Sequence, residues 1–404
     1  MIRNRSIVVC ISIVGAVFLA ALFMRIDRPL LWNDEADTAT YAQRITEVGY
    51  PKVHNGKRTL YTIDESGIDI NQKFDASVTA GWLQYYVAVP SVLLVRNISD
   101  LYIRTAILRI PFALLGTLGV LLFGLAIGQV LPHRRQRLWF ALAYAVAITL
   151  SVTLLVHLRE VRYYSISIFL CAGWFWSFIR SSILAKGKAS THVLVQFTTY
   201  TLTFLTFYPL AFIMAITTVA YASWQWWRNR LHAQIVRRAR ALLLAVGCFV
   251  LCLVPLTWFF RTIPIATYLS KLYSFSIGDY FTNIGTLLID FGKHELFIFA
   301  ILLQIFLLGL YLQVRHTQVQ QEIAPALRVW ALLVLFTIVY VLAIAKLPFF
   351  FQRYYLALYL TLASTIALAL VILLAVVPVT LPSDRLRSGK IFLDNFSYSS
   401  FTDL

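Results

Sequence analysis

The sequence predicts an all-α, polytopic membrane protein with about ten transmembrane helices and juxtamembrane helices in its first outer loop. Hydrophobic residues make up 60% of the chain, charged residues only 13%, and the mean hydropathy is +0.75, which excludes two or three water-soluble domains. The chain also contains roughly ten continuous apolar runs near the length that a helix needs to cross a bilayer. An outer-membrane barrel is disfavoured, because barrel strands alternate apolar and polar residues.

Run length separates the spanning helices from shorter ones. The first run, residues 6–24, follows Arg3 and Arg5 and is longer than the apolar core of a signal peptide, so we expect a retained first helix. The run 81–95 is too short to cross comfortably and contains Pro90, so we expect it along the membrane surface. The other predicted spans are 110–131, 138–156, 163–179, a pair within 193–227 that turns near Tyr208-Pro209, 241–260, 296–314, 329–345 and 354–379.

The basic residues orient these spans. If 81–95 does not cross and the N-terminus is cytoplasmic, the short inside segments carry 18 Lys and Arg and the short outside segments carry 7. This agrees with the positive-inside rule, whereas a crossing at 81–95 would place the basic clusters outside. We therefore expect a transmembrane domain over residues 1–382, a short polar cytoplasmic tail over 383–404, and a location in the cell inner or plasma membrane. The net charge of +17 then requires no nucleic acid, only anionic membrane lipid at the inner face.

Acidic residues gather on the opposite side, mainly in the first outer loop, residues 25–109. Of the 18 Asp and Glu residues, this assignment puts 14 outside and ten of them in that loop. Asn33 or Asp34 is expected to cap a helix that runs to about Glu47. Asp34, Glu35 and Asp37 would then lie at its N-terminus, where the helix dipole stabilises carboxylates. Helix capping alone is the simpler interpretation of this cluster.

Several segments, in order along residues 1 to 380, resemble motifs of one enzyme family. They are Trp32-Asn-Asp-Glu-Ala36 directly after the first helix, Gly81-Trp-Leu-Gln-Tyr85-Tyr86, Arg109-Ile-Pro-Phe-Ala-Leu-Leu-Gly116, Arg159-Glu160-Val-Arg162-Tyr163-Tyr164, Phe207-Tyr208-Pro209 and Gln352-Arg353-Tyr354-Tyr355. Together they resemble the GT-C glycosyltransferases, in particular the bacterial relatives of protein O-mannosyltransferases and of lipid A aminoarabinose transferase. Two features differ from that pattern. Residues 77–80 replace the family's His/Lys-Pro-Pro, and related enzymes often have 11–13 spans and a soluble outer C-terminal domain, which leaves open whether this C-terminus is truncated.

The resemblance implies an inverting transfer of a sugar from a polyprenyl-phosphate donor to an acceptor hydroxyl at the outer membrane face. Asp34 matches the family's first acid and is the expected general base, with Glu35 as the alternative. The expected partners are the lipid-linked donor, a lipid, glycan or protein acceptor, and membrane lipids. Outer cations that can hold the donor phosphate are Arg159, Arg162, Lys346, Arg353 and Lys271, and the expected supporting residues are Glu160, Asp37, Tyr85 and Tyr163.

Simpler interpretations stand beside these roles. Arg159 and Arg162 could snorkel at a helix end, and Arg353 could anchor an aromatic belt. Asp34, Glu35 and Glu160 leave a divalent cation open, but no His or Cys ligand spacing supports a metal site, and His157 and His294 fit packed or solvated histidines. A transporter or flippase of a lipid-linked sugar is the alternative function, and a non-catalytic scaffold is a third. The sequence contains no glycine-rich loop of the kind that binds phosphate, so it does not indicate an ATP-driven activity.

Overall fold

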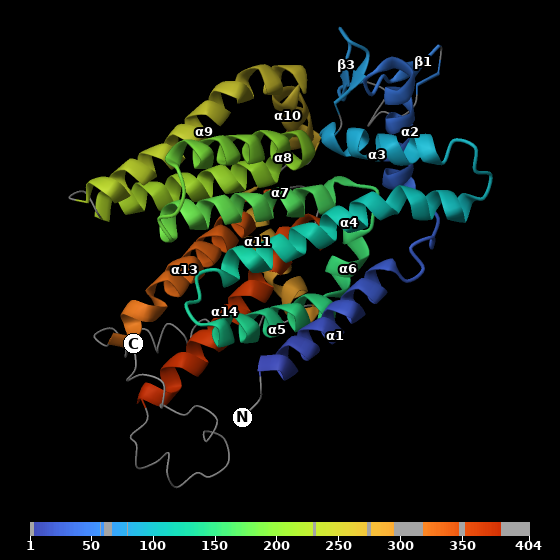
Figure 1. The fold of residues 1–404 in the computed structure, drawn as a ribbon. Coiled ribbons are helices and arrows are strands. Elements are labelled where there is room, and N and C mark those ends of the chain that lie inside the picture. The colour runs from blue at the N-terminus through green and yellow to red at the C-terminus, as the bar shows by residue number, and fades with distance from the viewer. Residues whose placement is uncertain are drawn as a thin grey trace.

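The structure, a computed structural model, is a helical bundle with a small cap of short helices and strands at one end (Figure 1). It describes residues 4–56, 58–59, 67–78, 80–228, 232–272, 276–294, 318–346 and 352–380. The predicted span 296–314 and the predicted tail 383–404 lie outside these residues.

The elements follow one another in this order along the chain. They are α1 (Asn4–Phe23), α2 (Asn33–Val48), β1 (His54–Asn55), β2 (Arg58–Thr59), β3 (Ile70–Asn71), β4 (Ala76–Ser77), α3 (Leu83–Leu94), α4 (Leu101–Gly128), α5 (Arg134–Leu150), α6 (Val152–Leu158), α7 (Tyr163–Phe178), the π-helix η1 (Ile179–Ile183), α8 (Ala189–Arg228), α9 (Ala233–Phe259), α10 (Thr262–Leu272), α11 (Ile277–His294), α13 (Gln318–Ile344), the 3-10 helix η2 (Gln352–Tyr355) and α14 (Leu356–Thr380).

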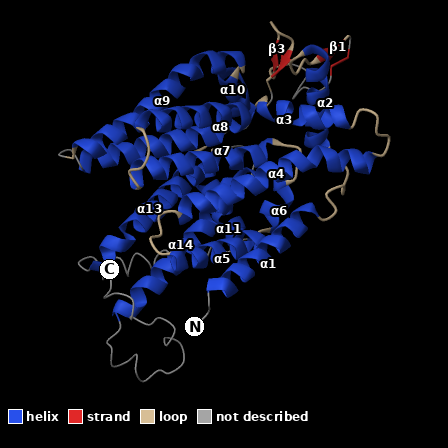
Figure 2. Ribbon diagram, in the orientation of Figure 1, coloured by secondary structure: helices blue, strands red, loops and turns tan. Residues whose placement is uncertain are grey.

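Seven of the described helices are long and apolar enough to cross a membrane, or eight if the bent pair α5 and α6 forms one span. The seven are α1, α4, α7 with η1, α8, α9, α13 and α14. These helices make the chain a multi-pass membrane protein. Figure 2 shows the strands, in red, together with α2 and α3 at one end of the bundle, which we call the α2 end. The start of α1 and the end of α14 lie toward the other end (Figure 1).

The apolar run 81–95 forms α3, which has only 12 residues and is not a candidate span, as the sequence predicts. A close approach of two backbones fixes where it begins. A Cβ atom on Gly81 would lie 2.2 Å from the carbonyl oxygen of Leu205 in α8. Because real Cβ atoms do not come so near a backbone oxygen, only glycine allows this contact. The start of α3 is therefore pinned against the middle of α8.

The predicted span 138–156 is a pair of helices that together are long and apolar enough for one broken span. Its residues belong to α5 and α6, which meet at Ser151 with a bend of 77°. Ser151 is extended, with φ −80° and ψ 98°, and its Oγ accepts a hydrogen bond from the backbone N–H of Leu154 at 3.3 Å. A serine that caps a new helix competes with continuation of the old one. Apolar composition cannot reveal this break, because both halves are apolar.

The 40 residues of α8 form a hairpin with two antiparallel arms. Phe207 has non-helical angles, φ −144° and ψ 90°, and Pro209 follows it. The hydroxyls of Tyr200 and Thr218 lie 2.6 Å apart, although a straight helix would separate these residues by about 27 Å. The turn that the sequence predicts near Tyr208-Pro209 is therefore confirmed.

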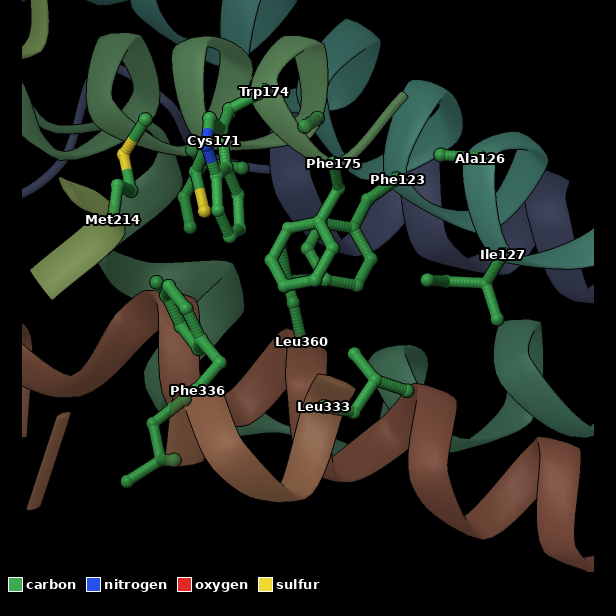
Figure 3. Packing of buried hydrophobic residues seen from close by; sticks show 14 of the residues in the cluster. Phe123, Ala126, Ile127, Cys171, Trp174, Phe175, Met214, Leu333, Phe336 and Leu360 are labelled. Carbon is green, nitrogen blue, oxygen red and sulfur yellow. The ribbon is translucent and has the colours of Figure 1, made fainter. Parts of the chain in front are cut away.

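The bundle core lies where α4, α7, α13 and α14 meet, and Figure 3 shows its aromatic centre. The Phe123 ring of α4 and the Phe175 ring of α7 have centroids 4.8 Å apart, and Phe336 of α13 lies 5.2 Å from Phe175. Since lipid tails are as apolar as these side chains, helix association here depends on close van der Waals contact. Gly119 of α4 provides such contact, because a Cβ there would lie 2.7 Å from the backbone nitrogen of Phe169.

The first loop contains two short β-hairpins, which the predicted all-α class does not include. β1 pairs with β2, and β3 pairs with β4, each as an antiparallel pair of two-residue strands. The second hairpin is held against the bundle, because Asn71 Nδ2 donates to the Phe259 carbonyl at 2.9 Å and Arg261 Nη1 donates to the Ile70 carbonyl at 2.7 Å. Such short strands carry no alternating apolar pattern by which a sequence could reveal them.

Candidate functional site

The helix α2 begins at the point where the chain leaves α1, and its first turn carries the predicted acids. The predicted cap residues, Asn33 and Asp34, are not the cap. Trp32 occupies that position in an extended conformation, and its backbone N–H donates to Glu35 Oε2 at 3.3 Å. The Glu35 side chain thus accepts the hydrogen bond of the Trp32 backbone N–H. The Asp34 carboxylate is therefore not needed for capping and can contact other helices.

Glu35 forms a closed ion pair with Arg109 of α4. Both side chains are buried, with exposed fractions of 0% for Glu35 and 3% for Arg109. Arg109 donates from Nε to Oε1 at 2.9 Å and from Nη2 to Oε2 at 2.5 Å, and Oε1 also accepts from the Val161 backbone N–H at 2.9 Å. The remaining Arg109 nitrogen, Nη1, donates to the carbonyls of Ile26 and Pro29. We call this group the Glu35 anchor, and it joins α2, α4 and the segments before α2 and α7.

Asp34 lies in a more open group, the Asp34 cluster, which consists of Asp34, Arg162, Arg353 and the aromatic rings around them. Its Oδ2 lies 3.2 Å from Arg162 Nη2 and 3.5 Å from Arg353 Nη2. The Asp34 side chain keeps 21% of its surface exposed, and both ion pairs use Oδ2 rather than Oδ1. Arg162 also donates from Nη1 to the Asp34 carbonyl at 3.3 Å. Three distant segments therefore meet at one partly exposed carboxylate.

Aromatic rings form the walls of the Asp34 cluster. The Arg353 guanidinium lies 4.6 Å from the centroid of the Trp32 ring, a cation–π distance. Phe207, at the α8 turn, stacks between Tyr163 and Tyr354 with centroid distances of 5.1 Å and 5.8 Å. The break in α8 thus supplies a ring to the cluster, which explains why an irregular backbone is tolerated there.

A small cavity of about 10 Å³, enough for about one water molecule, opens beside these rings. Its lining includes Tyr163, Tyr164, Ser167, Phe207 and Arg353. The Tyr164 and Ser167 hydroxyls are buried and have no hydrogen-bond partner among the described residues. Buried polar groups usually have partners, so these hydroxyls are available to an incoming polar ligand.

Asp37 and Tyr85 line the neighbouring part of α2 and α3. Burial raises the pKa of Asp37 above its usual range, while the Arg162 guanidinium opposes this shift and Asp34 adds to it. Burial also raises the pKa of Tyr85, which is 2% exposed and packs its ring 5.2 Å from Tyr41. Asp37 thus interacts electrostatically with the charges of the cluster, whereas Tyr85 of α3 packs against Tyr41 of α2.

Glu160 lies at the edge of the cluster and pairs with His157. The distance from His157 Nδ1 to Glu160 Oε1 is 2.9 Å, and the His157 ring contacts Tyr164 at 5.7 Å. Glu160 is 8% exposed, and its Oε2 is buried without a hydrogen-bond partner among the described residues. This oxygen, like the Tyr164 hydroxyl, can accept a ligand's proton donor.

Not every predicted phosphate ligand joins the cluster. Arg159 donates to the Met24 carbonyl at 3.1 Å, and burial together with the Arg109 charge lowers its pKa. Lys346 is exposed at the end of α13, and Lys271 is exposed in α10; no ion pair with Asp34 is seen for either. The side chain of His294 lies outside the described part of the molecule.

A metal site formed by Asp34, Glu35 and Glu160 does not fit the geometry. Both Glu35 oxygens are already occupied by Arg109. Within the described ranges, no group of three or more His, Cys, Asp or Glu residues is arranged to hold a metal ion. The four cysteines are free.

The sequence reasoning missed two participants. The sequence indicates Arg109 only as part of a motif, although a lone arginine in an apolar run needs a buried partner and so signals an ion pair. Trp32 also stands only within a motif, but its ring lies against the Arg353 guanidinium. A sequence pattern does not reveal that second contact, which joins residues more than 300 positions apart.

Comparison with known proteins adds no relative. No protein-family model matches this chain, and no curated protein or solved structure matches it.

Proposed function

We propose that this chain is an inverting glycosyltransferase of the GT-C type. In this proposal it moves a sugar from a polyprenyl-phosphate donor to an acceptor hydroxyl at the α2 end, on the outer face of the membrane. One observation carries the proposal: the partly exposed Asp34 carboxylate lies between two arginines from different helices, beside a cavity with unpaired hydroxyls. Such a transfer requires a base beside the acceptor and cations beside the leaving phosphate, on opposite sides of the sugar, so in this proposal the ion pairs of Asp34 open when the substrates bind.

Asp34 is the proposed base, and Glu35 is not. A general base needs an oxygen that the acceptor hydroxyl can reach. Both Glu35 oxygens accept hydrogen bonds from Arg109, and the Glu35 side chain has no exposed surface. Its role in this proposal is therefore to stabilise the packing of α2 against α4. The Asp34 side chain is 21% exposed, so an acceptor hydroxyl can reach it.

The proposed step is a direct displacement. The acceptor oxygen bonds to the anomeric carbon as its proton passes to Asp34, and the bond between that carbon and the phosphate oxygen breaks. The electron pair leaves with the phosphate, which needs no strong acid, and attack opposite the leaving group inverts the anomeric centre. Arg353 and Arg162 stabilise the growing phosphate charge, since guanidinium groups bind phosphate oxygens in pairs.

The remaining residues have supporting roles in this proposal. Tyr163, which lines the cavity, and Glu160, at the edge of the cluster, position the acceptor, while Asp37 and Tyr85 hold the face of α2 that carries Asp34. The cavity has room for only about one water molecule, so in this proposal the side chains around it move apart to admit the phosphate and the sugar. The polyprenyl chain would lie among lipid tails between the helices. Lys346 and Arg159 then contribute to the surrounding positive field and not to direct contact.

We also propose ten spans with both termini in the cytoplasm. The two arms of α8 support this count if each crosses once, and the apolar segment 296–314 supplies the last crossing. Single cysteines at Lys73 and Arg134, introduced into a cysteine-free background, test the sidedness. An impermeant maleimide added to intact cells is expected to label the first and not the second; the reverse pattern would invert the topology.

The decisive experiment is lipid mass spectrometry of cells that lack the protein, rescued with wild type, Asp34→Asn or Asp27→Asn. Asp27 is a matched control, because it is an acid of the same loop and its one ion pair among the described residues is with the exposed Arg28. We expect a polyprenyl-phosphate sugar to accumulate in the knockout and in Asp34→Asn, with transfer lowered about 10²–10⁴-fold, as for loss of a general base. Wild type and Asp27→Asn should show no accumulation.

Normal rescue by Asp34→Asn would remove Asp34 from the base role. If purified protein in vesicles instead moved a lipid-linked sugar across the bilayer without changing any bond, the chain would be a flippase.

A further inference from the structure

A second open site lies on the other side of α2 from the Asp34 cluster. It is a groove of about 490 Å³, bounded by α2, the end of α3, the start of α4 and the segment before α2. At 100° per residue, Ala36, Ala39 and Gln43, which line the groove, lie on the opposite face of α2 from Asp34 and Tyr41. The groove is therefore separate from the proposed catalytic centre, and a ligand bound there is independent of the proposed function.

The groove is positively charged. Arg96, in the segment between α3 and α4, and Arg104, in the first turn of α4, both line it. Among the described residues, neither side chain makes an ion pair or hydrogen bond. The one acid in the lining, Glu47, is already paired with Arg44. Two unpaired guanidinium groups next to a neutralised acid favour an anionic ligand.

The rest of the lining is mixed, with leucine, alanine and valine side chains beside the polar Thr40, Gln43, Thr46 and Thr105. Leu93 and Leu101 are 53% and 55% exposed, and they flank the turn at which the chain enters the spanning helix α4. Exposed leucines at this position are expected to contact lipid tails. We therefore expect the arginines beside them to reach the depth of the phosphate groups, because long cationic side chains extend toward the interface.

We propose that this groove binds one anionic phospholipid from the adjacent leaflet. Arg96 and Arg104 hold the headgroup phosphate, and an acyl chain lies over Leu93 and Leu101. The polar side chains of Thr40 and Gln43, exposed on α2, contact the rest of the headgroup. Since α2 also carries Asp34, a bound lipid would contact the face of α2 opposite Asp34 and stabilise the position of this helix.

Native mass spectrometry of the full-length protein with added phosphatidylglycerol tests the site. The variants are Arg96→Gln with Arg104→Gln, and Thr40→Trp, which fills the groove without changing its charge. The control is Lys73→Gln with Lys271→Gln, which removes two exposed cations from outside the groove. We expect wild type and control to retain one phosphatidylglycerol, and both groove variants to bind it at least about tenfold more weakly, a change of roughly 1.4 kcal/mol. Phosphatidylcholine should bind more weakly than phosphatidylglycerol.

Three results would overturn the proposal. They are equal binding of phosphatidylcholine, unchanged binding by either groove variant at an unchanged melting temperature, and displacement of the lipid by millimolar inorganic phosphate, which would mean that the acyl chain contributes nothing. If the arginine variant were unfolded, Thr40→Trp alone would decide.

Discussion

The Glu35 anchor and the Asp34 cluster use the same chemistry, a carboxylate and guanidinium groups, at adjacent positions of one helix. In the anchor, both carboxylate oxygens are filled and no side-chain surface is exposed. In the cluster, one oxygen contacts two arginines at 3.2 Å and 3.5 Å, and a fifth of the side chain remains exposed. A buried, complete pair holds elements together, whereas an open pair can exchange partners with a ligand.

The difference arises from the 100° rotation between successive residues of a helix. It points Glu35 toward α4, where Arg109 is enclosed by backbone carbonyls, and Asp34 toward the ends of α7 and α14. The comparison therefore predicts that substitutions in the anchor affect stability and that substitutions in the cluster affect activity.

The largest effect on stability is expected for Glu35→Gln. Removing the charge leaves Arg109 buried and unpaired, which costs about 3–5 kcal/mol when one partner of a buried pair is lost. The measurement is the melting temperature of the detergent-solubilised protein, followed by fluorescence-detected gel filtration. Asp34→Asn is the matched neighbour and should melt within about 2 °C of wild type, the shift expected for about 1 kcal/mol or less. Equal melting of Glu35→Gln and Asp34→Asn would break the comparison.

The next effect is expected for Arg353→Gln, which removes one cation from the cluster. If Arg353 stabilises the departing phosphate, transfer should fall about 10²-fold, as when one preorganised charge donor is lost. Kinetics with a purified lipid-linked donor measures this loss, and a nearly unchanged melting temperature is expected. Lys271→Gln is the control for loss of an exposed cation. A large drop in melting temperature would instead make Arg353 a structural residue like Arg109.

A smaller effect is expected for Arg162→Lys. The two terminal nitrogens of Arg162 contact different oxygens of Asp34, its carboxylate and its backbone carbonyl. A lysine keeps the charge but cannot make both contacts from a fixed fork, so activity should fall about tenfold, equivalent to roughly 1.4 kcal/mol. The same kinetic assay checks it. A fall as deep as that of Asp34→Asn would mean that the fork itself, and not the charge, is essential.

The smallest effect is expected for Asp37→Asn. Asp37 is neither fully buried like Glu35 nor in an ion pair with an arginine like Asp34 among the described residues. Burial raises the pKa of Asp37, so the folded protein binds this proton more tightly than the unfolded chain. Its contribution to stability is full below the unfolded pKa of about 3.8 and is lost as the pH rises through the higher folded value. Asn avoids that loss, so the variant should melt about 2 °C higher at pH 7 and show no gain near pH 4. A gain that is equal at both pH values would contradict this origin.

Much of the candidate site could be predicted from the sequence. The position of α2 and a set of acids and cations that includes Asp34, Arg162 and Arg353 follow from motif order, but the sequence left Glu35 as an alternative base. Lys346 and Arg159 resemble the other two cations in sequence, but they do not contact Asp34. Which of several cations at one end of a bundle reaches a carboxylate depends on helix rotation and tilt, which composition does not encode.

The sequence by itself determined that the chain is a multi-pass helical membrane protein with a short helix carrying acids after its first span. Apolar run length and local turn residues are properties of neighbouring positions, so they can be recognised without the fold. The tertiary structure alone decided that Glu35 pairs with Arg109 across 74 positions, that α5 bends into α6, and that Arg353 meets both Asp34 and Trp32. These outcomes depend on how helices far apart in the chain pack together. Only that packing decides which side chain lies next to a buried charge or ring.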